Sequence, residues 1–234
     1  MPDHTNELGQ PIGEALPDWQ PRPLPPRTPM PGRLVTLEPL NLDLHCVDLF
    51  DAFALDIDDR NWTYLPHGPF GEIDVFRTWM TANCFGDDPL FHAIVDTSSG
   101  RALGIASYQR IEPDVGSIEV GYINFSPALQ RTALATEAMF LMMQRAFDEL
   151  GYRRYEWKCD ALNAASQAAA QRLGFTYEGT FRQAIIYKGR SRDTAWFSIT
   201  DVEWQTKKIE FKRWLDPANF EPNGTQHTAL RQNK

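Results

Sequence analysis

Residues 118–138 read IEVGYINFSPALQRTALATEA and are the most informative part of the sequence. It predicts a β-strand that passes through a short loop directly into an α-helix. The first turn of a helix presents backbone N–H groups without intrahelical partners and the positive end of the helix dipole. Such a turn is suited to a phosphate or pyrophosphate group. Small residues at Ala133 and Ala135 allow a ligand to approach the backbone, and Arg131 adds a positive charge.

The sequence around this stretch predicts one α+β domain. Upstream we expect a strand, two helices and an antiparallel three-strand meander, at residues 33–40, 44–55, 73–85, 90–96, 102–111 and 117–125. Downstream we expect a long helix, a strand, a second helix, a strand hairpin and a closing helix, at residues 135–150, 155–159, 164–173, 175–187, 193–202 and around 211–215. Gly151 and Gly174 mark the ends of the two internal helices. No repeat or interior linker divides this series, which favours a single mixed sheet.

The ends of the chain differ in composition from this domain. Nine of the 17 prolines lie in residues 1–31, and a proline-rich run forms neither a regular helix nor a central strand. We therefore interpret residues 1–32 as an extended arm that Trp19 could anchor, with a loosely ordered tail as the alternative. The folded domain is expected at residues 33–216, followed by a C-terminal tail at 217–234.

Composition excludes several classes of function. A net charge of -8 argues against nucleic acid as a partner, because phosphate contacts need clustered Lys and Arg. Three scattered cysteines, Cys46, Cys84 and Cys159, lack metal-ligand spacing, so no metal is expected, and their low odd number suits a reducing cytoplasm. His67 and His92 are isolated and are interpreted as structural. No apolar run reaches membrane-spanning length and residues 1–30 lack an apolar signal core, so we expect a cytoplasmic protein without a membrane partner.

Known nucleotide motifs do not explain the stretch at 118–138, since it contains neither GxGxxG nor GxxxxGKS/T. Gln130-Arg131-Thr132-Ala133-Leu134-Ala135 does resemble the signature of the GNAT superfamily of N-acetyltransferases, Gln/Arg-x-x-Gly-x-Gly/Ala. The departure is Ala133, which stands where the family has glycine. An added methyl group would hinder the backbone there if the position requires a positive φ, whereas a helical backbone accepts alanine.

A second segment carries the same resemblance. Residues 159–166 read CDALNAAS and residues 170–175 read AQRLGF, which is similar to a GNAT strand-and-helix segment with Asn-x-x-Ser and a terminal Gly-Phe. Asn163 could equally be a simple helix cap. The resemblance covers residues 33–204 and is closest to the ribosomal-protein-alanine acetyltransferase-like branch. It implies a GNAT-type fold, a twisted, mostly antiparallel sheet between layers of helices.

The resemblance also implies a co-substrate and its binding residues. GNAT enzymes transfer an acetyl group from acetyl-CoA directly to an amine in a ternary complex. The backbone at residues 131–136 would hold the pyrophosphate, and the strand near Ile123 and Phe125 would pair with the pantetheine arm. An extra residue in the run at 123–125 suggests a β-bulge. The full predicted set is Ile123, Phe125, Gln130, Arg131, Thr132, Ala133, Leu134, Ala135, Thr136, Asn163 and Ser166.

The resemblance suggests two catalytic groups. The attacking amine must be neutral, so a base is needed, directly or through water. Glu119 lies on the strand where related enzymes often carry a basic carboxylate, although it could be a charged residue on a solvent face. Ser166 matches the position that assists the leaving thiolate in this branch, with Tyr187 and Tyr122 as further candidates. The loop at 62–70 and the hairpin at 182–187 are expected near the amine.

Two other functions stay open on the sequence. A GNAT fold without a working base would be a non-catalytic acyl-CoA sensor. The proline arm could instead serve an interaction protein as a ligand for aromatic grooves. The acceptor could be a small molecule or a protein N-terminus, and the protein a monomer or a homodimer.

Overall fold

The computed structural model describes residues 4–231. At its centre is an eight-stranded sheet with the strand order β3-β4-β5-β6-β7-β8-β10-β9. The strands are β3 (Met30–Pro31), β4 (Val35–Pro39), β5 (Leu90–Asp96), β6 (Ala102–Glu112), β7 (Ser117–Phe125), β8 (Arg154–Asp160), β9 (Thr176–Tyr187) and β10 (Arg190–Thr200). Only the pair β7 and β8 is parallel among these described strands. The predicted mixed, mostly antiparallel sheet is confirmed.

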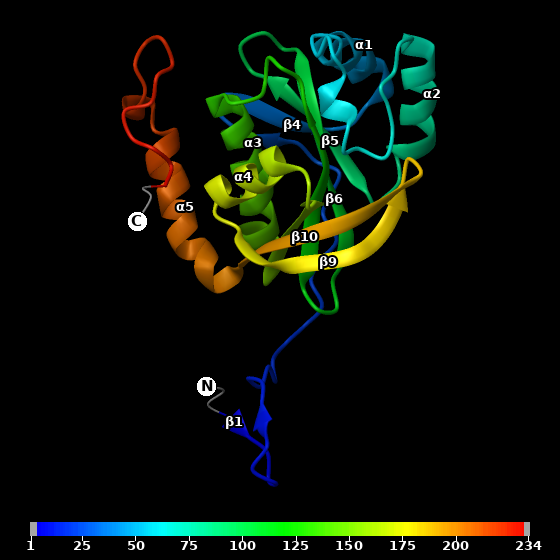
Figure 1. The fold of residues 1–234 in the computed structure, drawn as a ribbon. Coiled ribbons are helices and arrows are strands. Elements are labelled where there is room, and N and C mark those ends of the chain that lie inside the picture. The colour runs from blue at the N-terminus through cyan, green and yellow to red at the C-terminus, as the bar shows by residue number, and fades with distance from the viewer. Residues whose placement is uncertain (1–3, 232–234) are drawn as a thin grey trace.

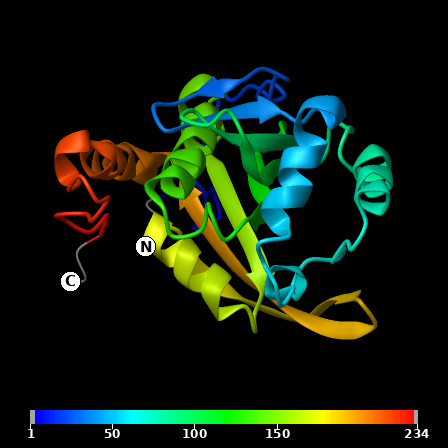
Figure 2. The same cartoon turned by 90° about the horizontal axis from the view of Figure 1, so that it is seen from above.

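Helices cover both faces of the sheet. They are α1 (Leu42–Phe53), α2 (Ile73–Asn83), α3 (Ala133–Gln144), α4 (Ala164–Leu173) and α5 (Asp201–Leu215). The π-helix η2 (Arg145–Glu149) continues α3, and η1 (Arg60–Trp62) and η3 (Pro217–Asn219) are short 3-10 helices. Figure 2 shows α1 and α2 on one side of the sheet and α3 and α5 on the other. This is the predicted three-layer arrangement. No helix between residues 4 and 231 is both long and apolar enough to cross a bilayer.

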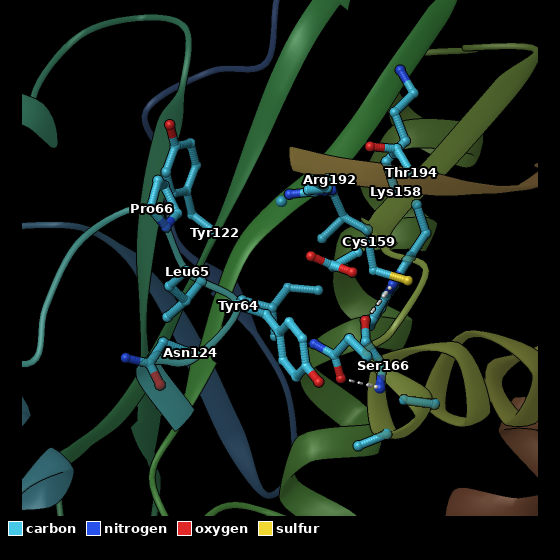
Figure 3. Close-up of a pocket in the computed structure, with 18 of the residues that line it drawn as sticks. Tyr64, Leu65, Pro66, Tyr122, Asn124, Lys158, Cys159, Ser166, Arg192 and Thr194 are labelled. Atoms are coloured by element: carbon cyan, nitrogen blue, oxygen red, sulfur yellow. Dashed lines mark hydrogen bonds between the residues drawn. The ribbon is translucent and has the colours of Figure 1, made fainter. Parts of the chain in front are cut away.

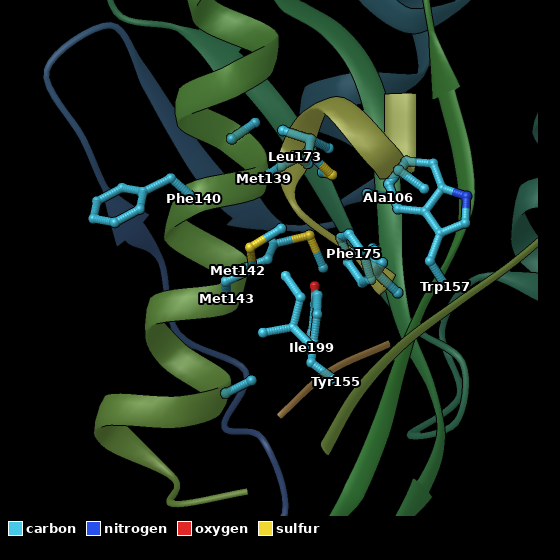
Figure 4. Packing of buried hydrophobic residues seen from close by; sticks show 14 of the residues in the cluster. Ala106, Met139, Phe140, Met142, Met143, Tyr155, Trp157, Leu173, Phe175 and Ile199 are labelled. Atoms are coloured by element: carbon cyan, nitrogen blue, oxygen red, sulfur yellow. The ribbon is translucent and has the colours of Figure 1, made fainter. Parts of the chain in front are cut away.

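Each face of the sheet has its own apolar core. Three methionines of α3, Met139, Met142 and Met143, pack towards aromatic and aliphatic residues of the sheet (Figure 4). The other core lies under α1 and α2 and is built on β5 and β6. The helices α1 and α2 therefore cover only one half of their face. The half formed by β7, β8, β10 and β9 stays available for a site.

The strands β7 and β8 separate part-way along their length. Their parallel pairing runs from Ser117 opposite Arg154 to Val120 opposite Trp157, and ends there. Beyond this point β7 stays paired with β6, and β8 stays paired with β10. A wedge opens between β7 and β8. Along it the backbone N–H and C=O groups that face the other strand have no strand to pair with.

The predicted β-bulge is present on β7. Asn124 pairs with Ile105 and Gly121 pairs with Ser107, so two residues of β7, Tyr122 and Ile123, lie opposite the single residue between them on β6. The bulge lies one residue upstream of the predicted run, and Tyr122 takes a left-handed backbone with φ of 47°. A bulge bends a strand and re-aims its side chains, which here occurs at the edge of the wedge.

Residues at both ends of the chain contact the domain. The hairpin of β1 (His4–Thr5) and β2 (Pro11–Ile12) stands away from the body in Figure 1, but the following segment lies along it. The Trp19 indole donates to the Asp114 carbonyl at 2.7 Å, as its predicted anchoring role requires. Met30 and Leu230 are both buried in the main core. The boundaries at 32 and 216 remain predictions, and residues 1–3 and 232–234 lie outside the described part.

Candidate active site

A cavity of about 1220 Å³ occupies the wedge between β7 and β8. Pockets for drug-sized ligands measure roughly 300–1,000 Å³, so the space suffices for the reactive arm of one substrate and the body of a second. Figure 3 shows Leu65, Pro66 and Tyr122 on one side of it, and Lys158, Cys159 and Thr194 on the other. Segments far apart in the sequence, the loop after η1 and the hairpin of β9 and β10, thus line the same space.

The loop at one mouth of the cavity leads into α3. Thr132 is the N-cap residue, and its hydroxyl oxygen accepts a hydrogen bond from the Ala135 N–H at 3.2 Å. Arg131, just before the cap, takes a left-handed backbone with φ of 61°. Ala133 is the first helical residue, and alanine is favourable in a helix. The methyl group that replaces the expected glycine hydrogen therefore lies on ordinary helical backbone.

Gln130 fixes the end of β7 beside this loop. Its side-chain amide donates to the Phe125 carbonyl at 2.8 Å and to the Asn61 Oδ1 at 2.9 Å. The Asn61 amide also donates to the Phe125 carbonyl, at 3.2 Å. The Phe125 carbonyl is thus already accepting two hydrogen bonds. Pairing of a pantetheine arm with β7 would fall on the bulged residues before it.

The first turn of α4 places two predicted residues on the cavity wall. Asn163 is the N-cap residue, and its Oδ1 accepts from the Ser166 N–H at 3.0 Å. The alternative interpretation of Asn163 as a cap is therefore correct, and the cap also fixes the backbone of Ser166. The Ser166 Oγ accepts a hydrogen bond from the Trp157 Nε1 at 3.0 Å. The Ser166 hydroxyl proton can be donated either to the neighbouring Cys159 sulfur or to a group in the cavity.

Cys159 lies beside Ser166 and could be mistaken for a nucleophile. Burial raises the pKa of the Cys159 thiol, and a hydrogen bond with Ser166 and the charge of Arg192 offset that effect only partly. The nucleophilic form of cysteine is the thiolate. At neutral pH Cys159 is therefore a protonated, weakly nucleophilic thiol.

Glu119 is buried within a network of charges. Its side chain is only 2% exposed, so the interpretation as a residue on a solvent face is wrong. One carboxylate oxygen accepts from Gln109 at 2.6 Å, and the other from Arg110 at 2.6 Å and from Lys158 at 2.9 Å. Both oxygens are already engaged. Direct contact with an amine would require one donor to move or a water molecule to bridge.

The network continues along β8. Lys158 also contacts Glu156 at 2.7 Å, and Arg154 contacts Glu156 at 2.6 Å. Arg154 in turn binds Glu178 of β9, at 2.8 Å. Within this network Glu119, Glu156 and Glu178 are each held by at least one cation. The charges set a fixed geometry at the floor of the cavity.

The two tyrosines predicted as further proton donors differ in their contacts. Tyr187 donates to the Asp160 carboxylate at 2.8 Å. Burial and that hydrogen bond raise the pKa of Tyr187 to about 12. Tyr122 packs at 5.2 Å from the Phe91 ring and at 5.7 Å from the His67 ring, measured between ring centroids. Burial lowers the pKa of His67 to about 4, so its imidazole is neutral near pH 7 and belongs to this aromatic cluster.

The comparisons with known proteins agree with this geometry. Residues 35–176, more than half of the chain, match the family described as "Acetyltransferase (GNAT) domain". The chain belongs to the GNAT family of acetyltransferases. The predicted family is therefore confirmed, and the protein is an acyltransferase.

Individual relatives of this GNAT protein extend the comparison. A crystal structure of a GCN5-related N-acetyltransferase from Brucella melitensis is 45% identical, with a TM-score of 0.90, and covers 92% of this chain and 97% of that one. The Bacillus subtilis (strain 168) protein named "Putative ribosomal N-acetyltransferase YdaF" is 26% identical over 109 residues, 47% of this chain and 59% of that protein. This agrees with the predicted branch. The microcin C7 self-immunity acetyltransferase MccE, solved with acetyl-CoA and AMP, shares the fold (TM-score 0.61, 21% identity, 72% of this chain and 93% of that one).

The predicted residues of this GNAT protein divide into two groups by position. On the cavity wall lie Glu119, Ile123, Phe125, Gln130, Arg131, Asn163 and Ser166. Thr132 to Thr136 form the cap and first turn of α3 beside the cavity, and the Thr136 hydroxyl accepts from Arg172 at 3.1 Å. Both predicted amine-side segments contribute, through Thr63–Pro66 and Ala184–Tyr187. Sequence reasoning missed the polar residues Gln109, Arg110, Lys158, Asp160, Arg192, Thr194 and Trp196, which also line the cavity.

Proposed function

We propose that the protein transfers an acetyl group from acetyl-CoA directly to a primary amine, in the cavity between β7 and β8. The observation that carries the proposal is the wedge itself, where two parallel strands separate over a helix N-terminus. An extended chain can add to the free edge of β7 as a further strand. The acyl arm of the co-substrate has the length and polar groups for this role.

The donor side fits the first turn of α3. The helix N-terminus offers N–H groups and a positive dipole end to the pyrophosphate, and Arg131 adds its charge at the same mouth. MccE, which shares the fold, was solved with acetyl-CoA, and this supports the same co-substrate here. Gln130 and Asn61 keep the end of β7 in place beside the loop.

Residues at the reacting centre have distinct proposed roles. A backbone N–H of the bulged segment of β7 polarises the thioester carbonyl. Glu119, through a bridging water, receives the proton of the amine. Ser166 donates its hydroxyl hydrogen bond to the departing thiolate sulfur. Because the Cys159 thiol is protonated, attack comes from the amine itself and no acetyl-cysteine forms.

A thiol-release assay tests the proposal. The purified chain is mixed with acetyl-CoA and a panel of amines, and free CoA thiol is followed against a reaction without protein. Release that depends on one of the amines, with a mass increase of one acetyl group on that amine, supports the proposal. If CoA binds tightly but no amine raises the rate above background, the protein is a sensor, and enzymatic transfer is excluded.

The base is tested separately with Glu119→Gln. The substitution keeps the shape but removes the proton acceptor, so we expect a kcat at least roughly 100-fold lower near neutral pH. The loss should shrink at high pH, where more of the amine is neutral. A pH–rate profile with an unchanged shape and height would remove Glu119 from this role. Glu178→Gln, on the outer end of the same network, is the matched control.

A further inference from the structure

Three side chains of β10 that line the cavity each carry a buried polar atom without a hydrogen-bond partner in the protein. Arg192, Thr194 and Trp196 alternate along the strand and share the face that lines the cavity, whereas Ala195 and Phe197 between and beyond them face the main core. Among residues 4–231, the Arg192 Nε, the Thr194 Oγ1 and the Trp196 Nε1 are buried and have no hydrogen-bond partner.

Such groups are rare in a folded protein. A buried donor without a partner costs about 1–3 kcal/mol, and three along one strand are not accounted for by packing. Thr194 lines the cavity but is only 6% exposed, so little of its side chain is open to solvent. Their place on one face of β10 indicates a ligand rich in hydrogen-bond acceptors.

The charges on this wall identify the kind of acceptor. Lys158, on the neighbouring strand, is already held by Glu119 and Glu156. In contrast, no carboxylate of the described residues forms an ion pair with the Arg192 guanidinium, whose nearest aromatic partner is the Tyr187 ring at 5.8 Å. A guanidinium binds a carboxylate through two parallel hydrogen bonds. Arg192 therefore lacks the anion that Arg110 and Lys158 already have.

The position of this wall relative to the reacting centre is set by the strand register. Thr194 lies opposite Asp160, and Ala195 opposite Cys159, on β8. Cys159 in turn adjoins Ser166, the proposed partner of the leaving sulfur. The unpaired donors thus lie on the strand next to the one that carries the reaction. The Phe181 ring, stacked on Trp196 at 4.5 Å, adds an apolar wall.

We propose that the acetyl acceptor is a small amine that also carries a free carboxylate, such as an amino acid with a large apolar side chain. Its carboxylate binds Arg192 and Thr194, its apolar part lies against Trp196 and Phe181, and its amine reaches the thioester. This inference rests on the proposed function and names its acceptor class. A protein N-terminus lacks a carboxylate at that distance, because its first carboxyl group is consumed in the peptide bond.

Matched acceptors test the proposal with the full-length chain. The proteinogenic amino acids, their amides and the corresponding decarboxylated amines are compared by thiol release, together with a short peptide with a free N-terminus. We expect at least one amino acid to exceed its own amide roughly tenfold to a hundredfold in kcat/KM, the value of one charge-assisted interaction. An amide or the peptide that outperforms every free amino acid would overturn the proposal.

Substitution of Arg192 gives the second arm of the test. Arg192→Met should lower kcat/KM for the preferred amino acid by a similar factor, mainly through KM, and leave its decarboxylated amine within about twofold. Arg182→Met, an exposed arginine of β9 outside the cavity, is the matched control. Equal losses on the acid and the amine would refute carboxylate recognition. Absence of thiol release with every amine would instead contradict the proposed function itself.

A binding measurement supplies a readout that is independent of turnover. The preferred amino acid, added with CoA, should raise the Tm of the unsubstituted chain and of Arg182→Met. It should not raise the Tm of Arg192→Met. Thr194→Val, which removes the hydroxyl at nearly constant volume, should weaken binding less than Arg192→Met, because a neutral hydrogen bond contributes less than a charged one. A ligand-induced shift that is the same in all four proteins would overturn the assignment.

Discussion

Replacement of Lys158 by methionine tests whether the charge network at the cavity floor is a structural unit. The Lys158 ammonium lies 2.9 Å from Glu119 and 2.7 Å from Glu156, and its side chain is only 8% exposed. It also lies 3.8 Å from the centre of the Trp196 ring. Methionine retains the volume of the stem but removes the charge, which leaves two buried carboxylates facing one another.

The expected loss follows from these contacts. Removal of one partner from a buried ion pair costs about 3–5 kcal/mol. After Lys158→Met, Glu119 still has Arg110 and Glu156 still has Arg154, so we expect the lower end, about 3 kcal/mol in the free energy of unfolding. A total stability of roughly 5–15 kcal/mol makes this a large fraction. The variant should nevertheless fold.

Urea unfolding at pH 7.5, followed by tryptophan fluorescence, measures the loss from the midpoint and slope. Lys208→Met is the matched control, because Lys208 forms a comparable 2.7 Å pair with Asp148 but is 26% exposed. A partly exposed pair is worth at most about 1 kcal/mol. The double variant Lys158→Met/Glu156→Gln removes one of the facing carboxylates and should recover part of the stability. The network is not a structural unit if Lys158→Met costs no more than the control, or if the double variant recovers nothing.

Three further outcomes follow from individual residues. Cys159→Ala should keep kcat within about threefold in the thiol-release assay, since the protonated thiol takes no acetyl group. Abolished turnover with CoA binding intact would contradict direct transfer from acetyl-CoA to the amine. Burial lowers the pKa of His92 to about 4, against 6.5 in the unfolded chain. The neutral His92 therefore contributes fully to stability above pH 6.5, and this contribution is lost as the pH falls from 6.5 to 4, by up to about 1.4 kcal/mol per pH unit. The urea midpoints at pH 7 and pH 5 should be further apart in the native chain than in His92→Phe. Ala133→Gly should change the Kd for CoA by less than about twofold, because the residue with a left-handed backbone in this loop is Arg131 and not Ala133. Calorimetry that finds tenfold tighter binding would show that the methyl group obstructs the site.

The local pattern of the sequence predicts much of the fold. The strand, loop and helix at 118–138 carry their own signals, so β7 and α3 were expected within a few residues of their observed bounds. The start of α5 was missed although the sequence contains the signal: Thr200 and Glu203 form a capping box at residue 201. The strand β3 could not be expected, because Met30 and Pro31 pair with β4 only through tertiary contacts. Two residues with a proline have no strand pattern of their own.

The difference between local sequence signals and tertiary contacts also explains which site residues were predicted. Asn163 and Ser166 were predicted because the segment that carries the family resemblance is a short local pattern, and the structure places both residues at the start of α4. The partners of Glu119 were not predicted, since Gln109, Arg110 and Lys158 come from two other strands. Their meeting depends on strand order and register. A single sequence without its pairings gives no information about which charges neutralise which.

Alternation along β10 shows most clearly what the sequence leaves undetermined. From residue 194 to 200, Thr194, Ser198 and Thr200 occupy one set of alternate positions and Ala195, Phe197 and Ile199 the other, which indicates a strand with one face turned away from the core. The pattern is the same whether that face meets solvent or lines a cavity. The covering layer decides, and here the core under α1 and α2 is built on β5 and β6, while the loop after η1 lines the cavity beside the other strands. The donors of β10 are thereby buried without being paired, which converts an ordinary polar face into a surface that selects a ligand.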